Sequence, residues 1–254
     1  PMTSRVYVQG SVLKSTLPYE RYESIFGLLK FWGKRFSVLH RYSRWAVPSY
    51  DLYKQCWGEL SPSREKYEKD IQKHLIVLAA DAKDRLLGQI AIVRTNLSEQ
   101  ELLKITYDRL LTPDVIDQAG DALVCVSICS AEYREKPTPL VARVPRAEEV
   151  RAYLDAGHDP VMRFHAKQKG RQKEGAALIG LIPGGRPEDK SSLGYNMLLK
   201  YPVPSGMVAV TESAPVSEQL IEMALLIAHD LGIEDVYAFS RPGGLASYMS
   251  KEVR

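Results

Sequence analysis

The clearest hydrophobic pattern in the chain lies near its C-terminus. Over residues 216–231, apolar side chains recur at the 3.6-residue spacing of a helix that is buried on one face. Pro215 suits the first position of that helix, and Gly232 suits the left-handed residue just past its end. A short strand is predicted at 233–240, before the corner Arg241-Pro242-Gly243-Gly244. In α/β proteins, a corner where a strand ends in this way is a common ligand-binding position.

The remaining patterns predict further strands and helices. Strands are expected at 74–80, 88–93, 121–130, 176–182 and 195–201. Residues 98–118 are polar and are expected to mix a loop with a short helix, and residues 148–168 form a second helical region that is broken around Gly157 to Pro160. The run at 121–130 is almost continuously apolar, which is typical of a strand in the middle of a sheet with both faces covered. The first two strands are expected to form a hairpin. The pair 176–182 and 195–201 flanks a glycine-containing corner at 184–189.

Residues 1–70 differ in character from the rest of the chain. They are predicted to be a mainly helical, aromatic-rich part, followed by an α/β core at 71–254, within one domain overall. The aromatic side chains are interpreted first as core packing under a layer of helices. A second interpretation is an aromatic-lined channel for an acyl chain or a pantetheine arm, and in that case Trp57 contacts the substrate.

The amino-acid composition argues against several classes of protein function. The chain has 254 residues, of which 45% are hydrophobic and 26% are charged, and its net charge is only +3. This small charge argues against nucleic acid as a partner. No apolar run approaches the roughly 20 residues needed to span a membrane, and no residue spacing suggests a metal site. The three cysteines are interpreted as reduced core thiols of a cytoplasmic protein: Cys56, Cys125 and Cys129.

Four segments carry a family resemblance. They are Leu-Val-Cys-Val-Ser-Ile-Cys-Ser-Ala-Glu-Tyr-Arg-Glu-Lys at 123–136, Asp-Pro-Val-Met-Arg-Phe-His at 159–165, Gly-Arg-Pro-Glu-Asp at 185–189 with Leu-Gly-Tyr-Asn at 193–196, and Val-Ser-Glu-Gln-Leu at 216–220. Together they resemble the GNAT superfamily of acyl-CoA N-acyltransferases, and within it the GNAT-like loading domains of polyketide synthases. The resemblance implies an α/β fold with a central mixed sheet flanked by helices.

The order of these segments departs from the family. In the family, the central strand leads through a glycine-containing loop directly into the Val-Ser-Glu-Gln helix. Here that helix begins about 80 residues later. Either the helix–strand unit has been relocated to the C-terminus, or residues 207–211 supply a substitute strand before the helix. By resemblance, Val216 and Ser217 at the helix start would bind the pyrophosphate of coenzyme A through their backbone N–H groups. The preceding loop has no glycine, and Pro215 has no N–H to donate, so we expect the pyrophosphate of coenzyme A to be bound differently here than in the family.

The resemblance also assigns site residues. It makes His165 catalytic, although a lone histidine in this setting is more often a core or surface residue. It pairs Ser240, at the end of the last predicted strand, with that histidine as a hydrogen-bond donor. It places Arg186 at the mouth of the acyl tunnel, where the alternative is a surface ion pair with Glu188 or Asp189. We expect His165, Ser240 and Arg186 to converge on one tunnel.

The implied reaction is decarboxylation of malonyl-CoA or methylmalonyl-CoA without a metal. The acyl group could then pass to the phosphopantetheine thiol of an acyl carrier protein, beside neighbouring polyketide-synthase domains. Two alternatives stay open. One is an amine N-acetyltransferase that uses acetyl-CoA, with Tyr237 or Tyr248 as candidate acids, and the other is a degenerate, non-catalytic GNAT scaffold module.

Overall fold

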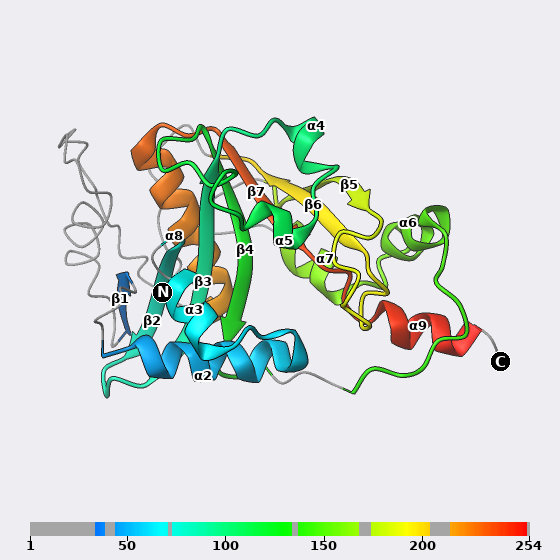
Figure 1. Ribbon diagram of the computed structural model, residues 1–254, viewed down its shortest axis with the longest axis horizontal. Coiled ribbons are helices and arrows are strands. Elements are labelled where there is room, and N and C mark those ends of the chain that lie inside the picture. The colour runs from blue at the N-terminus through cyan, green and yellow to red at the C-terminus, as the bar shows by residue number, and fades with distance from the viewer. Residues whose placement is uncertain are drawn as a thin grey trace.

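A mixed sheet forms the centre of the protein (Figure 1). The computed structural model describes residues 34–38, 44–70, 73–133, 137–167, 174–203 and 214–252. Within these ranges the sheet has seven strands in the order β1-β2-β3-β4-β7-β6-β5. The strands are β1 (Lys34–Val38), β2 (Leu75–Asp81), β3 (Leu86–Thr95), β4 (Ala122–Ser130), β5 (Ala177–Ile182), β6 (Asn196–Tyr201) and β7 (Asp235–Ser240). The helices are α2 (Ala46–Trp57), the 3-10 turn η1 (Gly58–Leu60), α3 (Arg64–Asp70), α4 (Glu99–Leu102), α5 (Tyr107–Leu110), α6 (Ala147–Asp155), α7 (Pro160–Ala166), α8 (Val216–Leu231) and α9 (Leu245–Glu252).

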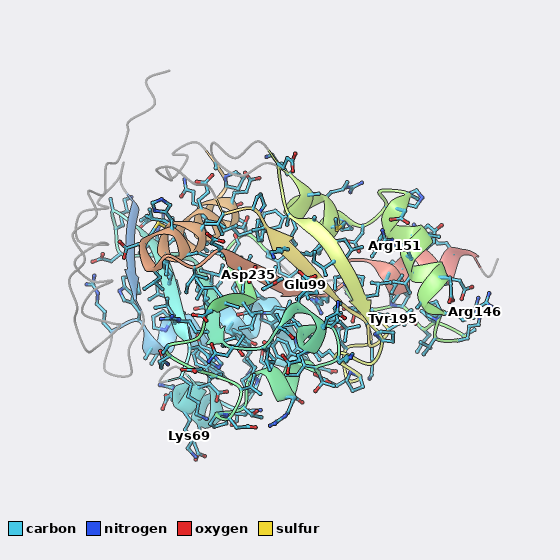
Figure 2. The ribbon with its side chains drawn as sticks, turned by 90° about the horizontal axis from the view of Figure 1, so that it is seen from above. Lys69, Glu99, Arg146, Arg151, Tyr195 and Asp235 are labelled. Atoms are coloured by element: carbon cyan, nitrogen blue, oxygen red, sulfur yellow. The ribbon has the colours of Figure 1, made fainter. Side chains whose placement is uncertain are left out.

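Helices cover both faces of the sheet, as the continuous apolar strands predicted. In Figure 1, α8 passes behind the sheet and α2 crosses in front of it. Alternate residues of β2 divide between two buried clusters, with Val77 and Ala79 on the α8 side and Ile76 and Leu78 on the α2 side. Seen from above, α6 with its exposed Arg146 and Arg151 lies at the end of the molecule opposite β1 (Figure 2). The fold is therefore a three-layer α/β arrangement.

The C-terminal helix and strand form as predicted, with differences at their edges. Helix α8 spans the predicted residues, and Gly232 ends it in the left-handed conformation with φ of 69°. Pro215 does not occupy the first helical position. It is the N-cap, and its carbonyl oxygen accepts hydrogen bonds from the backbone N–H groups of Glu218 and Gln219. All residues from 218 to 228 are buried, so burial is broader than the single stripe that the periodicity predicted.

The last strand of the chain lies inside the sheet. Strand β7 pairs parallel with β4 and antiparallel with β6, so the helix–strand unit that follows β6 in sequence returns to the centre. This confirms the predicted parallel pairing and agrees with a relocated unit. The alternative strand at 207–211 lies outside the described residues.

The N-terminal part corrects one expectation. Residues 34–38 form a strand, β1, rather than a helix, and it pairs antiparallel with β2 along the edge of the sheet. Pairing with an open strand edge decides the conformation of such a short segment more than its local pattern does. Residues 46–57 and 64–70 are helical as expected. The boundary at residue 70 remains a prediction, and residues 1–33 lie outside the described part.

Strand β4 bends away from β7 halfway along its length. Its pairing with β7 ends at Cys125 opposite Ala238. One residue further, the register with β3 shifts, so that Val126 is an extra residue between the pairs Cys125–Ile92 and Ser127–Ala91. A bulge of this kind increases twist and redirects side chains. The carboxyl ends of β4 and β7 therefore separate and leave an opening in the sheet.

The buried start of β4 should contribute strongly to stability. Leu123 is fully buried between β3 and β7, so Leu123→Ala is expected to lower the free energy of unfolding by about 2–5 kcal/mol. Urea unfolding followed by circular dichroism measures this. The matched control is Leu140→Ala, because Leu140 is 98% exposed and its loss should change stability by less than about 0.5 kcal/mol. Equal effects of the two variants would contradict the assignment of the core.

Candidate functional site

A cavity fills the opening between β4 and β7. Its volume is about 410 Å³, which lies within the range of small-ligand sites. The carboxyl ends of β4 and β7, the C-terminal end of α2, the start of α8 and one face of α7 line it. Most lining side chains are apolar. The polar ones are Ser127, Ser130, Glu132, His165, Ser217, Ser240 and Arg241.

His165 lies on α7, in the wall of this cavity. The helix begins at the N-cap Asp159 with Pro160 in its first turn, a favourable start. The His165 side chain is only 3% exposed, and its Nδ1 lies 2.5 Å from the hydroxyl of Tyr201 on β6. Burial raises the pKa of Tyr201 well above its ordinary value, so this partner is a neutral phenol. Tyr201 therefore fixes the orientation of the imidazole ring.

Ser240 and Arg241, at the end of β7, also line the cavity. The Arg241 guanidinium is held by Asp189, with Nη1 at 3.3 Å from both carboxylate oxygens, and by the hydroxyl of Ser191 at 2.9 Å. Burial acts to raise the pKa of Asp189. Arg241 and hydrogen bonds from Ser191 and Ser192 outweigh it and hold the pKa below the ordinary value. The cavity thus contains a cation whose charge is largely balanced.

Trp57 also lines the cavity, at the C-terminal end of α2. The Arg241 guanidinium lies 4.8 Å from the centre of its ring, and the guanidinium of Arg186 lies 5.0 Å from it. Such distances permit cation–π attraction. Trp57 is therefore positioned by two arginines from different loops.

Arg186 does not lie where we expected it. It lines a second, smaller pocket of about 110 Å³ on the α2 side of the sheet, not the cavity that contains His165 and Ser240. Its guanidinium packs 4.1 Å from the ring centre of Tyr107 and pairs with Glu188 at 2.9 Å. The Arg186 guanidinium lies over the rings of both Tyr107 and Trp57, and these contacts hold its side chain away from the larger cavity. The ion pair with Glu188, the alternative interpretation, is present, although the arginine itself is buried.

The two pockets meet at the β4 bulge. Val126 and Ser127 line both of them. Two buried polar atoms of the second pocket have no hydrogen-bond partner, the hydroxyl of Ser127 and Nε2 of His74. Burial, followed by repulsion from Lys73, lowers the pKa of His74 to about 4, so this imidazole is neutral at physiological pH.

Only one of the two residues predicted to bind coenzyme A at the start of α8 lines the cavity. Ser217 lines the cavity, whereas Val216 does not and instead packs against Gly88 of β3. Glu218 in the first turn is 8% exposed and pairs with Lys167 at 2.8 Å. A carboxylate in this position competes with a phosphate for the partial positive charge of the helix end. The contact of Val216 and Ser217 with a pyrophosphate stays a prediction.

Metal and membrane chemistry find no support in the described ranges. No group of three potential ligand side chains there could hold a metal ion, and no helix there is both long and apolar enough to cross a bilayer. None of the three cysteines forms a disulfide within the described ranges, and all three are buried. Burial raises the pKa of Cys125 to about 12, which makes this thiol a poor nucleophile.

Sequence reasoning missed three residues of the site: Tyr201, Asp189 and Arg241. The sequence indicates Tyr201 only as the end of a strand, and Asp189 only as an alternative partner of Arg186. It indicates Arg241 only as part of the corner after the last strand. Its position directly after Ser240 was the available signal, because a strand end that carries one site residue usually presents the next one nearby.

Comparison with solved structures identifies a known fold for this chain. No family model matches this chain, and no curated protein matches it. Among solved structures, the loading GNATL domain of CurA from Lyngbya majuscula matches with a TM-score of 0.50 and 18% sequence identity, over 66% of this chain and 96% of that domain. The chain therefore has a GNAT fold, similar to that of this loading domain.

Proposed function

We propose that the protein is a GNAT-type enzyme that decarboxylates a malonyl or methylmalonyl thioester of coenzyme A. One observation carries the proposal: His165, Ser240 and Arg241 line a single, mostly apolar cavity of substrate size. Two of these residues, His165 and Ser240, come from the resemblance to loading domains. The third, Arg241, comes from the geometry.

The reaction requires a poorly solvated carboxylate and fixed donors for the thioester oxygen. As CO2 leaves, the electron pair of the broken C–C bond moves into the thioester and forms an enolate. The His165 imidazole and the Ser240 hydroxyl are suited to stabilise the enolate oxygen. A proton, supplied by His165 or by water, then completes the acyl product. Apolar walls weaken solvation of the leaving carboxylate.

Arg241 suits the role of orienting the carboxylate. A free cation would stabilise the ionised substrate and so oppose its decarboxylation. Asp189 already balances the charge of Arg241. The guanidinium can therefore direct the substrate by hydrogen bonding without holding its charge strongly.

Coenzyme A and a carrier protein are the proposed partners. The thioester arm would reach the cavity past Ser217, at the start of α8. Transfer of the product acyl group to an acyl carrier protein phosphopantetheine, and a place beside neighbouring polyketide-synthase domains, are proposed from the similarity to a loading domain.

The test separates the candidate reactions. The protein is incubated with malonyl-CoA, methylmalonyl-CoA and acetyl-CoA in turn, with and without a phosphopantetheinylated carrier protein, and products are identified by mass spectrometry. Loss of CO2 from a malonyl thioester is expected without any amine. If none of the three thioesters changes and none acylates the carrier, a non-catalytic scaffold becomes the better proposal.

Amine acetylation has weaker support. Its candidate acids, Tyr237 and Tyr248, do not line the 410 Å³ cavity. Tyr237 instead donates a hydrogen bond to Glu99, and Tyr248 stacks with His158 and packs at a tilt against Tyr153. Acetyl transfer from acetyl-CoA to an amine in the same assay would overturn this ranking.

A further inference from the structure

Asp159 joins two neighbouring chain segments that both line the cavity, α7 and the end of β7. Its side chain is fully buried. One carboxylate oxygen, Oδ1, accepts a hydrogen bond from the backbone N–H of Met162 at 2.6 Å, which caps α7. The other, Oδ2, accepts one at 2.7 Å from the backbone N–H of Gly243, in the loop after β7.

Capping a helix does not require a buried carboxylate. Serine and asparagine cap about as well as aspartate, and each needs only one acceptor atom. Burying a charged group is costly, and here burial raises the pKa of Asp159 to about 6, although its amide donors and Arg163 favour the charged form. The second oxygen is therefore expected to serve a purpose besides capping. Only a group with two acceptors can serve Met162 and Gly243 at once.

Gly243 is fixed by further contacts. The hydroxyl of Tyr153 on α6 donates a hydrogen bond to the Gly243 carbonyl oxygen at 2.6 Å. A Cβ atom at this position would lie 2.5 Å from Cγ2 of Val161, so the loop packs directly on α7. The backbone N–H and carbonyl of one glycine are thus both bound by side chains from the α6–α7 region. This residue follows Ser240 and Arg241 by only two or three positions.

We propose that Asp159 is a positioning residue, which holds the wall carrying Ser240 against the helix carrying His165. The inference rests on the proposed function and extends it. Asp159 does not line the cavity and does not touch substrate. It fixes the relative position of two donors that must converge on one oxygen atom. Displacing one donor by about 1 Å can slow a reaction by up to about 100-fold.

Asp159→Ser separates capping from bridging. Serine can still accept the hydrogen bond from Met162, but its single, shorter hydroxyl cannot also reach Gly243. Asp159→Asn is the second variant, in case the serine protein folds poorly. The control is Asp155→Ser, which removes an exposed carboxylate that pairs with Arg151 at the end of α6.

Two measurements are made on the full chain. Amide hydrogen exchange by NMR reports protection at Met162 and Gly243 without any need for activity. In Asp159→Ser, exchange at Gly243 should accelerate by about tenfold or more, while Met162 keeps its protection. In malonyl-CoA decarboxylation, kcat should fall by about tenfold or more. KM should change by less than about threefold, because Asp189 still holds Arg241. Asp155→Ser should match the unaltered protein in both measurements.

The outcomes are distinguishable. Unchanged protection of Gly243 in both Asp159 variants would overturn the bridge. Increased exchange with an unchanged kcat would leave a structural contact and overturn the positioning role. An unaltered protein that decarboxylates no malonyl thioester would refute the proposed function and, with it, the catalytic part of the inference, while the exchange data would still decide the bridge.

Discussion

Replacing His165 with alanine is expected to slow malonyl-CoA decarboxylation by about 10²–10³-fold, the usual effect of removing one fixed donor to a developing oxyanion. The imidazole lies in the cavity wall, and Tyr201 orients it. Truncation also leaves the buried Tyr201 hydroxyl without this partner, so a loss of stability of about 1–3 kcal/mol is expected. The rate must therefore be measured on protein shown to be folded.

Two further variants separate the chemical role of His165 from its structural one. Tyr201→Phe removes the orienting hydroxyl but keeps the imidazole, and it should slow the reaction less than His165→Ala does. His229→Ala removes an exposed histidine at the end of α8 and should leave the rate unchanged. Product formation is followed by mass spectrometry, and folding by circular dichroism. If folded His165→Ala decarboxylates at the unaltered rate, His165 is not catalytic.

Much of the fold could be predicted because local patterns specify it. The 3.6-residue periodicity predicted α8, and Gly232 marked its C-terminal end to the residue. The continuous apolar runs of β4 and β7 predicted two strands covered on both faces, and parallel pairing follows from that. Strand β1 could not be predicted in this way, because its conformation depends on an edge of β2 that is distant in sequence.

The site was harder to predict than the fold. His165 and Ser240 line one cavity, as we expected, but the arginine that joins them is Arg241 and not Arg186. Both arginines lie in glycine-containing corners of the sequence. Which one faces the cavity depends on packing around Trp57 and Tyr107, which local sequence does not report.

Two of the four segments that carry the family resemblance each contain a buried aspartate. Asp159 from the first of these binds the backbone of Gly243, and Asp189 from the second binds the side chain of Arg241. Segments 159–165 and 185–189 thus support the same short loop after β7. In the sequence, both segments carry only a resemblance to the GNAT superfamily. Only the three-dimensional contacts connect their carboxylates to the loop beside Ser240.

The Asp189–Arg241 pair should behave as a coupled unit. Asp189 is 1% exposed and the Arg241 side chain 12%, so neither charge is well solvated. Removing one charge of a buried pair leaves the other uncompensated, and Asp189→Asn or Arg241→Met is each expected to cost about 3–5 kcal/mol of unfolding free energy. The double variant, which removes both charges, should be more stable than either single variant. Urea unfolding of the four proteins gives the coupling energy.

An exposed ion pair is the control for the effect of burial on the Asp189–Arg241 pair. Arg151 and Asp155 also form an ion pair, at 2.9 Å, but their side chains are 52% and 57% exposed. Water and salt screen such a pair, so Asp155→Asn should change stability by less than about 0.5 kcal/mol. In the decarboxylation assay, Arg241→Met should raise KM, because the substrate carboxylate loses its hydrogen-bond donor. The double variant should be more stable than Arg241→Met, but its KM should stay raised. If the double variant is as unstable as the sum of the two single variants, the carboxylate and the guanidinium act independently, and Asp189 does not balance the charge of Arg241 in the cavity.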